Sequence, residues 1–280
     1  MSSRRKQPVP DHEIAIIGAG LSGIGTAIAL LGAGFDDVVI YERASDIGGT
    51  WRDNIYPGVG VDVPSYAYQF SYALKPDWSR FFAKGQEVKA YIDHCADNYG
   101  IRPLLRLDCE VNERVWDESA HLWRLRINGK EATARYVVSA IGAFIDPKPT
   151  TIQGIDDFTG QVLRSASWNY SVPLTGKRAA IIGTGASAVQ IIPEIVTELA
   201  HLDVYQRTPI WVGPKFDPRI PWIVEQVFRR QPLIEDLSRR IVNRLLEFVL
   251  IEGVLNRSSA RALCNGLRWG LENLWYPAQI

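Results

Sequence analysis

Apolar and polar positions follow one another in blocks that predict a strand, a helix and a second strand near the start of the chain. Residues 13–17 form a short apolar run, and a longer segment rich in Ala, Ile and Leu follows a cluster of glycines. A second apolar run, Val38–Tyr41, ends at Glu42. Short apolar runs bounded by turn residues are typical of buried strands, and the longer segment is typical of a helix. This order predicts a parallel βαβ unit.

Three glycines separate the first strand from the helix in the spacing G-x-G-x-x-G. Gly18 permits the tight turn, Gly20 lets the backbone approach a pyrophosphate, and Gly23 lets the helix pack closely on the strand. The helix N-terminus offers unpaired N–H groups and partial positive charge to phosphates. Glu42 ends the second strand, where a carboxylate can accept hydrogen bonds from a ribose. Together these features predict a dinucleotide-binding site rather than a glycine-rich turn of another kind.

The same pattern recurs in the second half of the chain. Residues 178–182 and 202–206 are the expected strands, and the helix between them is expected to be interrupted at Pro193. Residues 183–188 have the variant spacing G-x-G-x-x-A, which places the expected cofactor contacts at Gly183, Gly185, Ser187 and Ala188.

Counting residues from the first glycine of each turn places Arg207 where the first unit has Glu42. A carboxylate at this position suits a free ribose hydroxyl, whereas an arginine suits a 2′-phosphate. We therefore expect FAD at the first unit and NADP at the second. The alternative is that Arg207 is a solvated cation at the end of a strand.

The residues between the two units predict a loop, a helix and three strands. The loop over 47–64 is rich in Gly and Pro, and loops after nucleotide-binding strands usually serve the site. Residues 87–98 carry apolar side chains at helical spacing. Three strands are expected over 104–140, with a hairpin turn at Asn128-Gly129 between the second and the third.

Residues 221–277 are predicted to be largely helical. Apolar residues recur every four positions at Leu233, Leu237, Ile241 and Leu245. Two i,i+4 ion pairs are expected on the other side of the helix, Glu235 with Arg239 and Asp236 with Arg240. We expect this helix to pack over a nucleotide domain. The apolar run 248–251 leaves a membrane-surface role as the alternative.

Composition narrows the class of protein. The chain has 280 residues, 46% of them hydrophobic, and its 31 basic and 31 acidic residues cancel, so nothing suggests nucleic acid as a partner. Its cysteines, Cys95, Cys109 and Cys264, form no C-x-x-C, which argues against a disulfide framework, a zinc site or a thiol redox centre. The first ten residues lack the apolar core of a secretory signal, and no apolar run is long enough to span a bilayer. We expect a cytoplasmic protein.

Taken together, the motifs resemble those of the flavin-containing monooxygenase superfamily, and in detail its Baeyer–Villiger type. The resemblance is carried by GAGLSG (18–23), E-R-x-x-D-I-G-G-T-W (42–51), YPG (56–58), Asp62, SAIG (139–142), GTGASA (183–188) and QRTP (206–209). It implies an α/β fold with two dinucleotide-binding, Rossmann-like domains, the second incomplete, followed by a helical segment. The expected boundaries are 11–146 for the N-terminal part of the FAD domain, 147–216 for a partial NADP domain and 217–280 for a helical insertion.

The resemblance also implies site residues. The FAD contacts are expected at the first glycine turn, at Glu42 and along the following loop, at Gly48, Gly49, Thr50, Trp51, Tyr56 and Asp62. Asp62 is the candidate catalytic residue, an acid near the flavin and the nicotinamide. An aspartate before Val-Pro could instead form a turn, and the two aromatic residues could be ordinary core. No metal is expected.

Two departures from the family pattern change the expectation. Its fingerprint is F-x-G-x-x-x-H-x-x-x-W-P; Phe158, Gly160 and Trp168 match, but Arg164 replaces the histidine and Asn169 the proline. The resemblance assigns this histidine to the coupling of the nicotinamide and flavin domains, so tight coupling is in doubt. The chain also stops inside what resembles the helical insertion, before the arginine that would pair with Asp62. The chain is then a fragment, a degenerate product or one half of a split enzyme that needs a second chain.

The resemblance implies an FAD- and NADPH-dependent monooxygenase that inserts one oxygen atom from O2 into a ketone through a flavin peroxide. The alternatives are an N- or S-oxygenating flavin monooxygenase acting on a heteroatom substrate, and a truncated, non-catalytic nucleotide-binding remnant. Trp168 favours the Baeyer–Villiger type over the N- or S-oxygenating one. Membrane association is not expected. We expect the isolated chain to be a poor monooxygenase.

Overall fold

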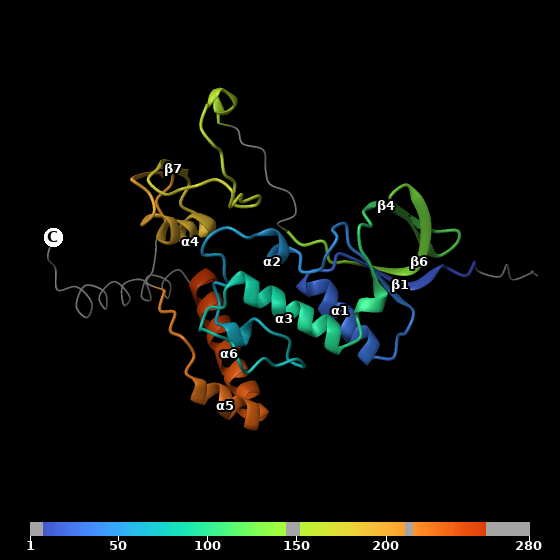
Figure 1. Cartoon of the computed structure of the whole chain (residues 1–280). Coiled ribbons are helices and arrows are strands. Elements are labelled where there is room, and N and C mark those ends of the chain that lie inside the picture. Colours follow the sequence, from blue (N-terminus) through green and yellow to red (C-terminus); the bar gives the residue numbers. More distant parts are fainter. Residues whose placement is uncertain (1–7, 144–151, 211–214, 256–280) are drawn as a thin grey trace, which may run out of the picture. The chain divides into compact units, whose positions relative to one another are not determined.

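The computed structural model describes residues 8–143, 152–210 and 215–255 (Figure 1). The chain divides into two compact units. One comprises Met1–Val61 with Ala83–Phe216, and the other comprises Asp62–Phe82 with Asp217–Ile280. The predicted mixed α/β fold with Rossmann-like units is confirmed.

The first compact unit is built on a six-stranded sheet in the order β3-β2-β1-β6-β5-β4. Four neighbouring strands, β3, β2, β1 and β6, run parallel to one another. Strand β5 runs antiparallel to both of its neighbours, β6 and β4. The structure therefore adds a short edge strand, β3, to the three that were expected in this region. The strands are β1 (His12–Ile17), β2 (Val38–Tyr41), β3 (Leu105–Arg106), β4 (Val111–Asp117), β5 (Leu122–Ile127) and β6 (Lys130–Ser139).

Strand β6 belongs to both halves of this sheet. Its residues 130–134 pair with β5, and from Ala134 onward it pairs with β1. The predicted hairpin turn before it is confirmed, because Asn128 and Gly129 have φ +47° and +79°, as a type I′ turn requires. The antiparallel hairpin is thereby fused to the nucleotide-binding strands.

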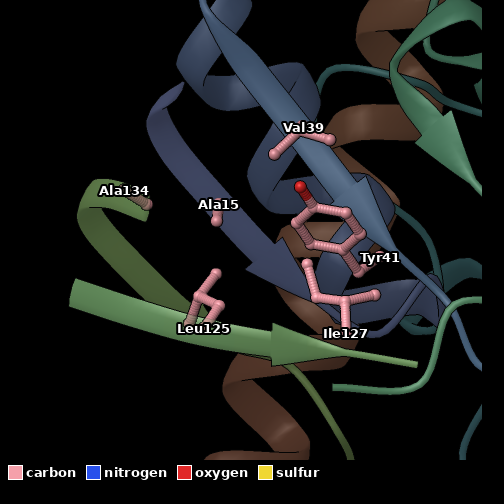
Figure 2. Close-up of a cluster of buried hydrophobic side chains, with 6 residues drawn as sticks. All are labelled: Ala15, Val39, Tyr41, Leu125, Ile127 and Ala134. Atoms are coloured by element: carbon pink, nitrogen blue, oxygen red, sulfur yellow. The ribbon is translucent and has the colours of Figure 1, made fainter. Parts of the chain in front are cut away.

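The core of the sheet lies where these halves meet (Figure 2). Ala15, Val39 and Tyr41 come from the parallel strands and pack against residues of β5 and β6. The last four residues of β1 and all four of β2 are buried, as expected for parallel strands covered on both faces. In the second half of β5, exposed Arg124 and Arg126 instead alternate with buried Leu125 and Ile127. The partners from β5 and β6 are Leu125, Ile127 and Ala134.

Three helices accompany this sheet: α1 (Leu21–Gly32), α2 (Thr50–Asp53) and α3 (Gly85–Asn98). Helix α1 buries Gly23, Ile24, Ala27 and Ile28, one face of a helix. Helix α3 begins two residues before the predicted start and buries the predicted apolar positions Val88, Tyr91, Ile92 and Cys95. Short 3-10 turns lie at Arg102–Leu104 and Ile155–Asp157.

The second βαβ unit is present, as predicted. It consists of β7 (Arg178–Ile182), α4 (Ala186–Ile195) and β8 (His201–Tyr205), and its strands pair in parallel. The predicted interruption at Pro193 is wrong, because α4 continues through this proline to Ile195. In the described parts of the chain this sheet has two strands.

The other compact unit contains a 3-10 turn, Ser65–Ala67, and helices α5 (Trp222–Arg230) and α6 (Pro232–Leu255). The helical prediction is confirmed as far as Leu255, and residues 256–277 lie outside the described residues. The predicted apolar stripe of α6 is exposed along its length, so it is not the packed face of the helix. Its residues are Leu233, Leu237, Ile241 and Leu245. No helix among the described residues is long and apolar enough to cross a bilayer.

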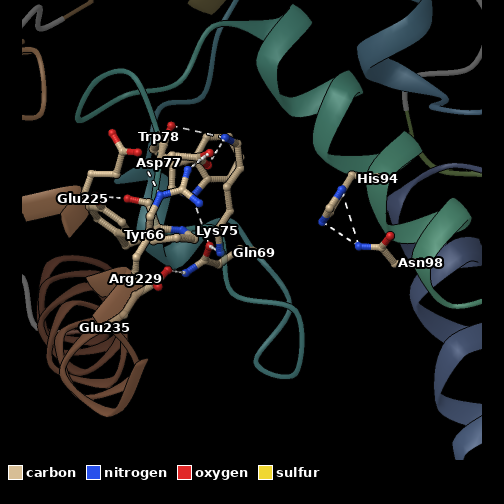
Figure 3. Close-up of polar contacts among 11 residues, drawn as sticks. Tyr66, Gln69, Lys75, Asp77, Trp78, His94, Asn98, Glu225, Arg229 and Glu235 are labelled. Atoms are coloured by element: carbon tan, nitrogen blue, oxygen red, sulfur yellow. Dashed lines mark hydrogen bonds and ion pairs between the residues drawn. The ribbon is translucent and has the colours of Figure 1, made fainter. Parts of the chain in front are cut away.

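The buried face of α6 carries a carboxylate instead. Glu235 is 1% exposed and accepts a hydrogen bond from Gln69 Nε2 at 3.1 Å (Figure 3). The predicted pair between Glu235 and Arg239 is therefore wrong. Asp236 takes both arginines, at 2.7 Å from Arg239 and 2.7 Å from Arg240. Burial of Glu235 explains the exchange, because its carboxylate points away from the exposed side of the helix.

Candidate functional site

The first glycine turn has the close contacts that its spacing predicts. Gly18 has φ +102°, and its N–H donates to Tyr41 O at 2.8 Å. A Cβ on Gly18 would lie 2.6 Å from Ala140 O, and a Cβ on Gly23 would lie 1.9 Å from Gly18 O. Side chains are therefore excluded at both positions. Gly20 is the N-cap residue of α1, and the first N–H groups of a helix have no partner within the helix.

A second pair of glycines packs directly on this turn. The Gly48 N–H donates to Ala19 O at 2.9 Å, and a Cβ on Gly49 would lie 3.1 Å from Gly20 Cα. Gly48 and Gly49 have φ +117° and +52°, conformations that favour glycine. The structure thus brings together the predicted glycines of the 18–23 and 42–51 motifs, backbone against backbone.

Glu42 lies beside this turn and is 5% exposed. Its Oε2 accepts from Ala19 N at 2.8 Å, and its Oε1 accepts from Ala44 N at 3.0 Å. The Arg52 guanidinium lies 3.2 Å from Oε1. A carboxylate offers about four lone-pair sites, so three donors leave it about one further acceptor position.

Sequence reasoning missed three charged residues that hold the glycine pair. Arg52 Nη1 donates to Asp46 O, and Lys89 Nζ lies 2.8 Å from the Asp46 carboxylate. Burial opposes the charge of Lys89, but hydrogen bonds to Asp46 and Asp93 outweigh it and raise its pKa above the usual value. A Cβ on Gly48 would lie 2.5 Å from Lys89 Cδ. The available signal was the i,i+4 pair of Lys89 and Asp93 on a predicted helix.

The other predicted loop residues have different surroundings. Thr50 begins α2 and is exposed, whereas Trp51 is half-buried and faces Gly85 at the start of α3. Tyr56 is buried against Ile191 and Ile195 of α4, as the core interpretation expected.

Asp62 is the first residue of the other compact unit. It is exposed and has no ion-pair partner in the part of the chain that the structure describes. Its catalytic role stays a prediction.

The loop over 55–60 connects the two nucleotide-binding regions. Gly60 N–H donates to Gln190 Oε1 at 3.0 Å, and a Cβ on Gly58 would lie 2.3 Å from Gln190 O. Tyr170 Oη donates to Ile55 O at 2.6 Å. Because Gln190 follows the second glycine turn by a few residues on α4, this loop packs close to the second turn.

The second turn repeats the geometry of the first. Gly183 has φ +103°, and its N–H donates to Tyr205 O at 2.8 Å. Gly185 stands before α4, and Ser187 and Ala188 lie in its first turn.

The strand register corrects the residue-count superposition. Tyr41 and Tyr205 are equivalent, so Gln206, not Arg207, is the structural counterpart of Glu42. Gln206 Nε2 donates to Thr184 Oγ1 at 2.9 Å, beside the second turn. The second strand of the second unit ends one residue closer to its first glycine than that of the first unit, so counting residues from the glycine points one position too far. Arg207 is exposed and lies one position further along.

The fingerprint segment forms a turn and an aromatic anchor. Ser167 N–H donates to Arg164 O at 3.1 Å, and the Arg164 side chain is exposed. Trp168 packs against the cluster of Tyr56, Ile191 and Ile195. In the described ranges, no three His, Cys, Asp or Glu side chains are grouped as a metal ion would need.

The sequence is similar to a known protein family and to several known proteins. The model of the pyridine nucleotide-disulphide oxidoreductase family matches residues 15–233. A Baeyer–Villiger monooxygenase of Streptomyces coelicolor is 43% identical over 237 residues, covering 84% of this chain and 46% of that protein. A Baeyer–Villiger monooxygenase of Pseudomonas aeruginosa is 43% identical over 246 residues, covering 86% of this chain and 47% of that protein. The chain spans about half the length of these relatives.

Solved structures of monooxygenases also match this chain. A crystal structure of OTEMO in complex with FAD and NADP matches with a TM-score of 0.73 and 33% identity, over 80% of this chain and 44% of that one. An oxidized steroid monooxygenase bound to NADP matches with a TM-score of 0.72 and 32% identity, over 78% and 43%. The sequence given contains no C-x-x-C. The chain belongs to the pyridine nucleotide-disulphide oxidoreductase family, and its resemblance to the Baeyer–Villiger monooxygenases is confirmed.

Proposed function

We propose that this chain carries the FAD and NADP sites of a monooxygenase that inserts one oxygen atom from O2 into a ketone. The observation that carries the proposal is the pair of glycine turns with one backbone geometry, the first beside a buried glutamate and the second beside an amide and an arginine. The printed names of the relatives favour a ketone over a nitrogen or sulfur substrate.

The first turn fits FAD. The contacts at Gly18 and Gly23 exclude side chains, and Gly49 lies on Gly20, so bare backbone faces the space before α1 that a pyrophosphate would occupy. Glu42 keeps an acceptor position for a ribose hydroxyl. FAD would be held by these residues, with Thr50 and Trp51 beside it.

The second turn fits a dinucleotide phosphate in the same way, and the exposed Arg207 suits a 2′-phosphate. NADP would be held by Gly183, Gly185, Ser187 and Ala188, with Arg207 on the adenosine side. The 55–60 loop, through Gln190, would set the distance between the two sites.

FAD, when bound, supplies the redox chemistry that transfers electrons from NADPH to O2. The residues of the chain bind and orient the two cofactors and limit the access of water. Asp62 is proposed as the acid near the flavin and the nicotinamide. With Arg164 in place of the fingerprint histidine, we expect NADPH consumption to exceed product formation.

The test begins with binding. Purified protein is titrated with FAD and then supplied with NADPH and a panel of ketones and sulfides, and product is measured against NADPH consumed. We expect saturable FAD binding, a preference for NADP over NAD, and ester formation at less than one product per NADPH. Folded protein that binds no FAD would overturn the proposed function, and sulfoxide without ester would replace the ketone by a heteroatom substrate.

A further inference from the structure

Arg52 connects two segments that form the first nucleotide site. Its side chain is 17% exposed, and it is the third residue of the short helix α2. Nη1 lies 3.2 Å from Glu42 Oε1 and also donates to Asp46 O. Nε and Nη2 donate to the two oxygens of Asp53, at 2.7 and 2.9 Å.

The two contacts of Nη1 lead to different walls of the site. Glu42 follows the end of β2 and contacts the glycine turn through Ala19 N. Asp46 precedes the glycine pair, and the Gly48 N–H donates to the carbonyl oxygen of the same residue, Ala19. Arg52 therefore closes a ring of contacts from the carboxylate through the glycine turn and the glycine pair back to its own helix.

We propose that Arg52 is a positioning residue for the dinucleotide, which fixes the Glu42 carboxylate and the Gly48-Gly49 backbone in one arrangement. The proposal rests on the proposed function of this site. A guanidinium can satisfy two acceptors with fixed geometry, which an ammonium or an amide at this position cannot do equally well. Loss of the arginine would leave Glu42 buried without its cationic partner, and that loss is costly.

The alternative is that Arg52 acts only through its charge, by attracting an anionic dinucleotide. Arg106 provides the matched control. Its guanidinium donates to Pro103 O and Leu105 O, and it is exposed on the strand next to β2. Arg106 meets Glu42 through its backbone, because Arg106 O accepts from Glu42 N–H at 3.0 Å, and a side-chain substitution keeps that bond. The R106Q variant therefore removes the same charge as R52Q from a guanidinium that contacts Pro103 O and Leu105 O rather than the Glu42 carboxylate.

The experiment measures FAD affinity of the ligand-free protein for the wild type and for R52Q, R52K, R106Q, E42Q and the double variant R52Q/E42Q. We expect R52Q to weaken FAD binding at least tenfold, R52K to recover part of the loss, and R106Q to change it less than about twofold. In the E42Q background, R52Q should cost less than about threefold, because the carboxylate that it positions is already altered.

A second readout needs no FAD. The Gly48 N–H, which donates to Ala19, should exchange with solvent faster in R52Q than in R106Q, and R52K should lie between them. Equal losses for R52Q and R106Q, or a full tenfold effect of R52Q in the E42Q background with unchanged exchange at Gly48, would overturn the positioning role. Wild-type protein that binds no FAD would instead refute the proposed function, a result distinct from equal binding by the wild type and R52Q.

Discussion

The turns after β1 and after β7 can be compared angle by angle. The first glycine has φ +102° in one and +103° in the other, and its N–H donates at 2.8 Å to the last residue of the second strand in both. The second glycine has φ −76° and ψ −173° in one turn and φ −70° and ψ −175° in the other. This backbone is set by local sequence, because only glycine takes the first position without strain.

The surroundings of the two turns differ. Tyr41 at the end of β2 is 7% exposed, whereas its counterpart Tyr205 is 60% exposed and Ile182 of β7 is 64% exposed. A Cβ on Gly18 would collide with Ala140, the residue after β6, but a Cβ on Gly183 would meet none of the described residues within 4 Å. A glycine motif therefore fixes the backbone of its own turn, whereas the burial of that turn depends on residues far along the chain.

The largest expected effect is at the position where the first motif has glycine and the second has alanine. The Gly23→Ala variant would place a Cβ 1.9 Å from Gly18 O, so α1 must move off β1. We expect a loss of about 3 kcal/mol in the free energy of unfolding, measured by denaturant titration, together with loss of FAD binding.

Gly32 at the end of the same helix is the matched control, because a Cβ there would have no neighbour within 4 Å among the residues that the structure describes. Gly32→Ala should be neutral or stabilise by up to about 1 kcal/mol. If Gly23→Ala behaves like Gly32→Ala, the close contact does not distinguish the first unit from the second.

A smaller effect is expected where the two units are joined. Gly58 has φ +80°, and its Cβ would lie 2.3 Å from Gln190 O. Gly129 has nearly the same φ, +79°, and a Cβ there would have no described atom within 4 Å. Gly58→Ala should cost about 2 kcal/mol and Gly129→Ala about 1 kcal/mol, because only the former adds a collision to backbone strain.

Weakened NADP binding in the Gly58→Ala variant but not in the Gly129→Ala variant would assign the additional loss to the loop that contacts α4. Equal stability losses in the two variants would show that the contact with Gln190 carries no energy.

The elements of both βαβ units could be predicted because their signals are local. Apolar runs, glycine spacing and the Asn128-Gly129 turn each depend on a few adjacent residues. The contact of Gly49 with Gly20 could not be predicted, since it joins segments 29 positions apart without any periodic signal. The same holds for Arg52 and Glu42.

Two other features show what periodicity leaves open. The apolar stripe of α6 was recognised, but spacing does not say whether anything covers a stripe, and its residues are exposed. The counterpart of Glu42 was predicted one residue too late. Counting residues assumes that the segment between the first glycine and the end of the second strand has the same length in both units, but it is one residue shorter in the second unit. Register is settled by strand pairing, which the sequence of one strand does not contain.

That one-residue shift leads to a prediction about the preference for NADP over NAD, which should change about tenfold. If Gln206 stands where the first unit has Glu42, Gln206→Glu should place a carboxylate near the ribose. We expect it to lower the preference for NADP over NAD about tenfold by repelling the 2′-phosphate and strengthening NAD binding. Arg207→Gln should weaken NADP and leave NAD unchanged. Stronger NAD binding from Arg207→Glu, but not from Gln206→Glu, would restore the residue-count alignment.

The last prediction concerns a second buried glutamate, Glu235, whose surroundings differ from those of Glu42. Glu42 is buried beside an arginine, whereas Glu235 is buried beside an amide, Gln69. Gln69 is itself held by Lys75 N–H and Trp78 Nε1, at 2.8 and 3.0 Å (Figure 3). Burial raises the pKa of Glu235, the Gln69 hydrogen bond opposes the rise, and Asp77 and Asp236 add to it while Lys75 lowers it.

Because the folded state favours the protonated form of Glu235, its contribution to stability is fully present below the unfolded pKa and is lost as pH rises through the folded pKa. Glu235→Gln keeps a neutral group at this place, so the variant should gain on the wild type in denaturant titrations as pH rises from 4 to 7. Asp236→Asn on the same helix is the opposite control, since hydrogen bonds to Arg239 lower the pKa of Asp236. That variant should be less stable than the wild type at pH 7, with the difference shrinking in acid. If the stability difference from the wild type changes with pH in the same way for both variants, burial does not raise the pKa of Glu235.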